Sequence, residues 1–248
     1  IMSALLYLLP IPLLSKTEKK KFRMTGSFGV ALVWIAPGSF AMGCPDDAEI
    51  PDPAAVPVHK VNISKGFWIG KYEVTQRQWS KVMGNNPSLR IGDDKPVERV
   101  SWHDARQFCK KLSEIDNCVY RLPTEAEWEY VARKSKEITD DNIGSYAWHR
   151  DNTATTTKQV GTRLPNRVGV YDMLGNVFEW CYDLYDSKYY STSEANDPKG
   201  PKSSDDDDRV ARGGSYSSWP KVRCWHRGTE TPHERNWQVG FRVVREAD

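Results

Sequence analysis

Cysteine is scarce in this sequence, and its five positions are not arranged for metal binding. Cys44, Cys109, Cys118, Cys181 and Cys224 include no C-x-x-C pair and no local cluster with histidine, which excludes a thiolate zinc site. An odd number leaves at least one thiol unpaired within the chain, and buried structural thiols are the simplest interpretation. The cysteines therefore indicate neither a metal centre nor a redox compartment.

Charge of one sign and long apolar runs are also lacking. The net charge of the 248 residues is only +2, so composition gives no sign of nucleic-acid binding. The most apolar stretch, residues 1–14, is broken by two prolines and is too short to span a bilayer, although a secretory signal core or a non-native tail remains open. Residues 1–30 are predicted to be an apolar and basic extension, and residues 31–245 one globular domain.

Apolar and aromatic residues are present in quantity. The apolar content is 39%, enough for one sizeable core, and 10 Trp, 11 Tyr, 17 Gly and 15 Pro favour short elements joined by many turns. Residues 31–42 predict two short strands paired as a hairpin around a Pro-Gly turn, and residues 67–74 predict another strand. A helical bundle is thereby disfavoured.

Helices are predicted at three capping signals. Thr75 with Gln78 has the form of a capping box, and Thr124 with Glu127 has the same form. Ser101 precedes a stretch in which apolar residues fall at helical spacing, including Ala105, Phe108, Cys109 and Leu112. After residue 151 loops dominate until residues 239–243, which alternate as a strand with one face inward.

Six segments carry a family signature. They are G-K-Y-E-V-T-Q at 70–76, the segment 96–102, Y-R-L-P-T-E-A-E-W-E-Y at 120–130, G-V-Y-D-M-L-G-N-V-F-E-W-C at 169–181, R-G-G-S-Y at 212–216 and V-G-F-R at 239–242. In this order they resemble the formylglycine-generating-enzyme family, also called the sulfatase-modifying-factor domain. The resemblance implies a single α+β domain of C-type-lectin-like fold, with small antiparallel sheets, two main helices and much irregular loop.

Membership of this kind does not fix the activity, because the fold carries both enzymes and binding modules. The family's oxidase branch uses two cysteines a few residues beyond G-G-S-Y to bind copper and engage a substrate thiol. Residues 217–223 contain no cysteine here, and Cys224 matches a structural position. The resemblance therefore implies no catalytic residue and no cofactor required for catalysis. The iron-dependent sulfoxide-synthase branch is excluded as well, since the chain has no H-x-x-x-H arrangement.

A calcium ion is held in family members where D-M-L-G-N-V-F-E stands in this sequence. Carried over residue by residue, the resemblance implies the side chains of Asp172 and Glu179 and the carbonyls of Gly175 and Val177 as ligands. All four supply the hard oxygen donors that calcium prefers. A loop held by hydrogen bonds alone is the alternative, and an ion at this place would be structural.

The segment 216–238 differs in composition from the framework motifs on either side. It contains three tryptophans and two histidines among Ser, Thr, Asn, Glu and Arg, a mixture typical of antibody binding loops. The same stretch is similar to the variable region of the proteins that diversity-generating retroelements diversify, of the treponemal kind. Cys224, Arg227, Pro232 and Arg235 are expected to be scaffold. The predicted ligand-binding residues are Tyr216, Ser217, Ser218, Trp219, Arg223, Trp225, His226, Gly228, Thr229, Glu230, Thr231, His233, Glu234, Asn236, Trp237 and Gln238.

The sequence therefore predicts a non-enzymatic, receptor-like protein that presents a diversified surface to a macromolecular ligand, with a protein as the first choice. It is expected to act as a monomer without nucleic acid, secreted or at a bacterial cell surface, with any membrane attachment lying outside this chain. A fixed-partner or carbohydrate-binding module of the same fold is the alternative. An oxidase of the formylglycine-generating type is a further one, against which the missing cysteine pair stands.

Overall fold

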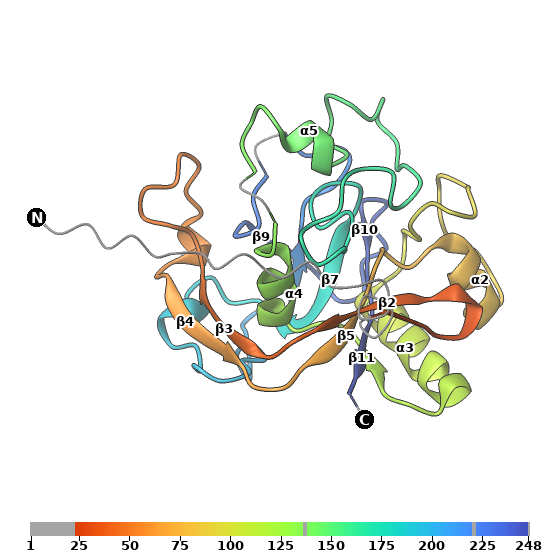
Figure 1. The fold of residues 1–248 in the computed structure, drawn as a ribbon, viewed down its shortest axis with the longest axis horizontal. Helices are drawn as coiled ribbons and strands as arrows, with labels where there is room; N and C mark the ends of the chain where they lie inside the picture. Colours follow the sequence, from red (N-terminus) through yellow and green to blue (C-terminus); the bar gives the residue numbers. More distant parts are fainter. Residues whose placement is uncertain (1–22, 136–137, 220–221, 248) are drawn as a thin grey trace, which may run out of the picture.

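A computed structural model describes residues 23–135, 138–219 and 222–247 of the chain (Figure 1). These residues form a single α+β domain of small sheets, short helices and long loops, as the sequence predicts. The predicted apolar and basic segments before residue 22 lie outside the described residues. No helix in the described ranges is long and apolar enough to cross a membrane.

The largest sheet joins the two ends of the described chain. All its neighbouring strands run antiparallel. Its order is β1 (Arg23–Thr25), β2 (Ala31–Ile35), β5 (Phe67–Gly70), β11 (Val244–Glu246) and β6 (Tyr120–Arg121). Because β1 begins at Arg23, this sheet starts before residue 31, the position at which the sequence analysis begins the domain.

Two smaller sheets complete the strands. The second sheet has the order β10 (Val239–Gly240), β7 (Phe178–Leu184), β8 (Arg209–Arg212) and β9 (Arg227–Glu230). Its β10–β7 pair is parallel, whereas the other pairs are antiparallel. The third sheet pairs β3 (Gly38–Met42) with β4 (His59–Ile63).

Two strand predictions are wrong. Residues 31–42 do not form a hairpin, because β2 already lies between β1 and β5 and has no free edge for β3, which pairs with β4 instead. Residues 239–243 form no continuous strand either, since β10 ends at Gly240 and β11 begins at Val244, in different sheets. The stretch between them is buried on both faces, including the Arg242 side chain.

The helical predictions are confirmed. Each of the three main helices begins with a capping box, at Thr75, Ser101 and Thr124, in which side chains satisfy amide groups that the first turn leaves free. The α-helices are α2 (Gln76–Met83), α3 (Trp102–Asp116), α4 (Glu125–Ala132) and α5 (Ile143–Tyr146). Short 3₁₀ turns are η1 (Ser27–Gly29), η2 (Pro53–Ala55) and η3 (Tyr189–Ser191).

Helix α4 lies in the middle of the molecule, against β3 and β4 on one side and β7 and β8 on the other (Figure 1). All eight of its residues are buried, including Glu125, Glu127 and Glu129. A buried carboxylate is costly unless it is paired. Each of these glutamates is paired with an arginine, and two of those arginines, Arg212 and Arg227, belong to the later strands β8 and β9.

Candidate functional site

A buried ion network joins α4 to β8 and β9. Arg212 donates to Glu125 Oε1 at 2.8 Å and to Glu129 Oε2 at 2.5 Å, and Arg227 binds both oxygens of Glu125 at 2.7 and 3.0 Å. The two arginine side chains have no exposed surface. Burial acts to raise the pKa of Glu125, but the charges of Arg227 and Arg212 lower it overall, so the carboxylate is ionised.

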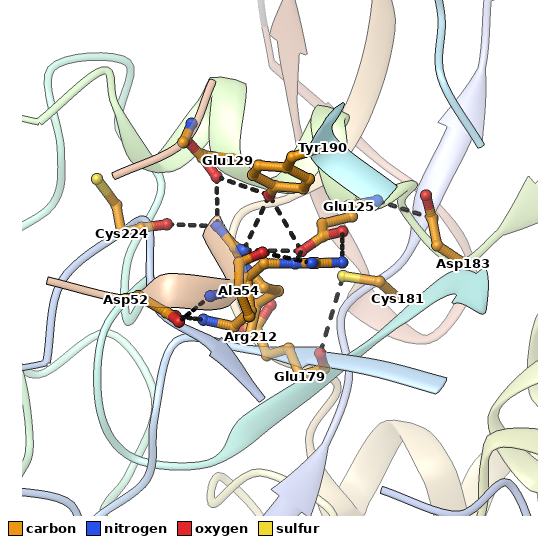
Figure 2. Close-up of polar contacts among 12 residues, drawn as sticks. Asp52, Ala54, Glu125, Glu129, Glu179, Cys181, Asp183, Tyr190, Arg212 and Cys224 are labelled. Carbon is orange, nitrogen blue, oxygen red and sulfur yellow. Dashed lines mark hydrogen bonds and ion pairs between the residues drawn. The ribbon is translucent and has the colours of Figure 1, made fainter. Parts of the chain in front are cut away.

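The same network anchors the segment that follows β8. Arg212 also donates to the carbonyl of Cys224 at 2.5 Å (Figure 2). The backbone N–H of Arg227 donates to Asp52 Oδ2 at 2.8 Å, and its guanidinium donates to the carbonyl of Ala54 at 2.7 Å. These bonds fix residues 224–227 to the loop before β4 and agree with the scaffold role predicted for Cys224 and Arg227.

Three of the predicted ligand-binding residues lie on this anchored segment and face inward. Arg223 is 8% exposed and pairs with Asp140, and Trp225 donates to the carbonyl of Ile50 at 3.3 Å. His226 accepts from the Arg223 N–H through Nδ1 at 3.0 Å, and burial lowers the pKa of its imidazole. Arg223 is thus buried and Trp225 and His226 are half-buried, so these residues do not lie on a fully open surface, and their ligand-binding role stays a prediction.

A cavity of about 470 Å³ lies beside this segment. Arg223, Cys224 and Trp225 line it, together with Ile50 and Leu174. Burial raises the pKa of the Cys224 thiol to about 11, so the thiol is protonated near neutral pH and is a poor nucleophile. All five cysteines lie in the described residues and none forms a disulfide.

A second group of predicted residues is exposed and clustered. Trp219 and Trp237 are 67% and 52% exposed, the largest exposed fractions among the aromatic residues that the structure describes. Gln238 ties the two ends of the segment together, because its Oε1 accepts from the hydroxyls of Ser215, at 2.8 Å, and Ser217. The tryptophans thus project from backbones that are bonded to each other through side chains.

Framework residues fix the exposed group further. Arg150 donates its backbone N–H to the carbonyl of Ser218 at 3.1 Å, and its guanidinium lies 3.8 Å from the centre of the Trp219 ring. The Arg99 N–H donates to the carbonyl of Asn236 at 3.1 Å. Tyr216 is the exception within this group, since its side chain is only 6% exposed and serves the framework more than the surface.

The remaining predicted residues lie between the two groups. Gly228, Thr229 and Glu230 belong to β9, an edge strand that the sequence did not predict, and the turn after it contains Thr231, His233 and Glu234. Glu230 accepts from the Asn236 amide at 2.9 Å. The His233 ring lies 4.7 Å from that of His103 at the start of α3. Scaffold residue Arg235 pairs with Asp104 at the surface.

Arg242 is bonded to two of the four predicted calcium ligands, Asp172 and Glu179. The other two are Gly175 and Val177. Both oxygens of Glu179 accept from Arg242, at 2.5 and 2.6 Å, and Oε2 also accepts from the Trp128 indole at 2.8 Å. Asp172 has one oxygen bonded to the Gly161 N–H at 2.6 Å and one buried oxygen, Oδ1, without a partner. Asp172 could serve a cation, but Glu179 in this arrangement is occupied by a guanidinium.

Among the described residues, no group of three or more His, Cys, Asp or Glu side chains is placed to hold a metal ion. The four oxygen donors therefore do not fit calcium as they are arranged, because an ion next to Glu179 would face the positive charge of Arg242. The calcium site stays a prediction from the resemblance.

One exposed element near Asn236 gave no recognisable signal in the sequence. It is the loop that carries Leu89 and Ile91, which are 47% and 68% exposed. An aliphatic residue in a polar loop looks the same in a sequence whether it packs inward or outward. Only the fold places this loop beside residues 216 and 236.

Comparison with known proteins places the sequence of this chain in a family. The pattern of the Sulfatase-modifying factor enzyme 1-like domain matches residues 20–247. A chaperone protein LppX of Paenibacillus barcinonensis is 33% identical over 72% of this chain and 80% of its own length. The formylglycine-generating enzyme of Streptomyces coelicolor is 33% identical over 73% of this chain, and the match spans only 62% of that enzyme.

Two solved structures have closely similar folds. Treponema denticola variable protein 1 is 29% identical, with a TM-score of 0.79, and the match covers 91% of this chain and 98% of that protein. PvdO from Pseudomonas aeruginosa is 27% identical, with a TM-score of 0.80 and the same coverage. A variable protein and PvdO thus both share the scaffold of this chain.

Proposed function

Because the chain belongs to the sulfatase-modifying factor enzyme 1-like domain family, in which enzymes and a variable protein share one scaffold, we propose its function from its own surface. It is a non-enzymatic ligand-binding protein. Its ligand-binding face consists of Ser217–Trp219 and Asn236–Gln238, and its partner is another macromolecule, in the first instance a protein.

The observation that carries this proposal is the exposure of Trp219 and Trp237 on a fixed backbone. Aromatic side chains provide large contact areas at a low cost in conformational entropy, and they dominate the energetics of binding interfaces. Ser217 and Gln238 supply adaptable hydrogen-bonding groups beside them. Because the neighbouring backbone is bonded to Arg99 and Arg150, little order has to be gained when a ligand binds.

The thiol chemistry supports a binding role over an oxidase role. Residues 217–223 lack the cysteine pair that the oxidase branch needs, and the Cys224 thiol has its pKa raised to about 11 by burial. A thiolate, not a thiol, is the nucleophile and the soft metal ligand. Calcium is not required for this role.

Diversification by a retroelement and display at a bacterial surface are further parts of the proposal, supported by the likeness to Treponema denticola variable protein 1. Reading the DNA around the gene tests the first part. We expect a reverse transcriptase and a near-copy of the codons for residues 212–242 that differs where the template has adenine. Without such a copy, the face would serve one fixed partner.

Substitution of Trp237 tests the binding face itself. Peptides are selected from a displayed random library against the full chain, and the affinity of an enriched peptide is measured for wild type and for Trp237→Ala. We expect a loss of about 2 kcal/mol or more, which is about 30-fold in Kd, with an unchanged Tm. Normal affinity together with a lowered Tm would show that Trp237 is structural and would exclude this face.

A further inference from the structure

The loop between α2 and α3 presents aliphatic side chains to solvent on a backbone that is held rigidly. Leu89 and Ile91 are 47% and 68% exposed, and Arg90 between them is exposed as well. Single exposed aliphatic residues are ordinary on a protein surface. Two of them flanking an exposed arginine on one rigid loop form a larger patch, which is more often a contact surface.

A buried glutamine holds one side of this loop. Gln76, at the start of α2, is 1% exposed. Its amide nitrogen donates to the carbonyls of Arg90 and Pro96 at 3.0 and 3.2 Å, and its amide oxygen accepts from the Gly92 N–H and the Asn86 side chain. Of these four bonds, those to the Arg90 carbonyl and the Gly92 N–H fix the backbone on both sides of Ile91.

Glu98 holds the other side. Its Oε1 accepts from the backbone N–H groups of Leu89 at 2.7 Å and Arg90 at 2.9 Å, and Ser88 bonds to its backbone. The Glu98 side chain is completely buried, and its second oxygen has no partner. Leu89, Arg90 and Ile91 therefore point outward from a preorganised backbone and are not left exposed by disorder.

The loop adjoins the proposed ligand-binding face. Arg99, at the end of the loop, donates to the Asn236 carbonyl next to Trp237. Glu98, the residue before Arg99, binds the N–H groups of Leu89 and Arg90, so this part of the loop lies within one side chain of the Arg99–Asn236 contact. The loop that carries Leu89 and Ile91 thus adjoins the backbone that carries Trp237.

The loop carries exposed charges of both signs, but Asp93 and Asp94 pair with Arg77, which leaves arginines as the charges without a carboxylate partner. Arg90, Arg99 and Arg150 are all exposed. No carboxylate among the described residues forms an ion pair within 4 Å of Arg90 or Arg99, and Arg150 approaches only Asp151, at 3.9 Å. Positive charge around an apolar centre favours a partner with acidic residues around an apolar patch.

We propose that Leu89, Arg90 and Ile91 form a fixed half of the ligand-binding face, and that the partner is a protein presenting an apolar patch rimmed by acidic side chains. This rests on the proposed function. The fixed half supplies affinity that does not depend on which residues occupy positions 217–219 and 236–238. The residues at positions 217–219 and 236–238, the variable half of the face, then select among partners of this general chemistry.

The experiment uses the full chain and a displayed library of random peptides. We expect enriched peptides to contain Asp or Glu next to Trp, Phe or Leu. With one such peptide, Ile91→Ser should weaken binding about tenfold, because the apolar contact is lost. Arg90→Ala should weaken it about threefold and reduce its dependence on salt concentration. The control is Ile115→Ser, since Ile115 is a similar exposed aliphatic, 49% exposed, near the end of α3.

The outcomes separate this inference from the proposed function. If Trp237→Ala abolishes binding while Ile91→Ser and Arg90→Ala bind like wild type, the loop is no part of the face, although the face exists. If Trp237→Ala also leaves the affinity unchanged, the proposed function fails with it. Enrichment of basic peptides, or no enrichment over bare resin, likewise overturns the inference. Unchanged far-UV circular dichroism and Tm for Ile91→Ser exclude unfolding as the cause of a loss.

Discussion

Two parts of the segment 216–238 both carry tryptophan, but they differ in how their side chains are placed. Residues 223–227 contain arginines, a tryptophan and a histidine, and they are pulled against the core by buried arginine–glutamate pairs. Residues 217–219 and 236–238 also contain tryptophans, but these side chains project into solvent. The difference teaches that composition identifies a segment able to bind, whereas the positions of buried charges decide which of its residues are free to do so.

The buried part is held by charge and the exposed part by neutral hydrogen bonds. Without Arg212 and Arg227, Glu125 would lose both of its arginine partners inside the protein and Glu129 would keep only Arg133, so replacement of these two arginines is strongly constrained. In the exposed part, the framework binds the backbone of Ser218 and Asn236. The side chains of Trp219 and Trp237 can therefore change without removing these bonds, whereas those of Ser217, Ser218, Asn236 and Gln238 take part in hydrogen bonds that hold the loop.

Removal of Arg212 should have the largest effect. Arg212→Ala removes the fully buried partner that Glu125 and Glu129 share, which leaves Oε2 of Glu129 without its ion pair, and we expect a loss of about 3–5 kcal/mol in the free energy of unfolding. Urea denaturation followed by fluorescence measures it. Arg235→Ala is the matched control, because Arg235 pairs with Asp104 at the surface and should cost less than about 1 kcal/mol. Equal losses for the two variants would erase the distinction between buried and exposed charges.

Tryptophan replacements should separate the two parts with a smaller effect. Trp225 is half-buried against the core and bonded to Ile50, so Trp225→Ala should lower the free energy of unfolding by about 2 kcal/mol. Trp219→Ala should change it by less than about 0.5 kcal/mol, since the side chain is mostly in water. Thermal denaturation of both variants checks this. A larger loss for Trp219→Ala than for Trp225→Ala would reverse the assignment.

Calcium should have the smallest effect. Because Glu179 is bonded to Arg242, we expect the Tm to be the same within about 1 °C in EGTA and in millimolar calcium. Differential scanning fluorimetry makes the measurement, with magnesium as the control cation. A calcium-specific rise in Tm would show that Glu179 can leave Arg242 for the ion, and it would establish the structural site that the family resemblance implies.

Local signals in the sequence predicted the helices well and the strand pairing poorly. The capping boxes at Thr75, Ser101 and Thr124 depend on residues three apart, so they can be read directly from the chain. The pairing of β2 with β1 and β5 depends on segments far along the chain, and no local pattern in residues 31–42 reveals it. The candidate site shows the same limit, because Trp225 and Trp237 look equivalent in the sequence.

The sequence by itself determined the family, the α+β class, the helix starts and the segment in which exposed aromatic residues occur. These features are encoded in local spacing and in motifs whose order the chain preserves. Only the tertiary structure decided that Arg223 is buried, that Glu179 is bound by Arg242, and that the loop carrying Leu89 and Ile91 is bonded through Arg99 to Asn236. The reason is physical: burial and ion pairing depend on neighbours that are distant in sequence and meet only in the folded chain.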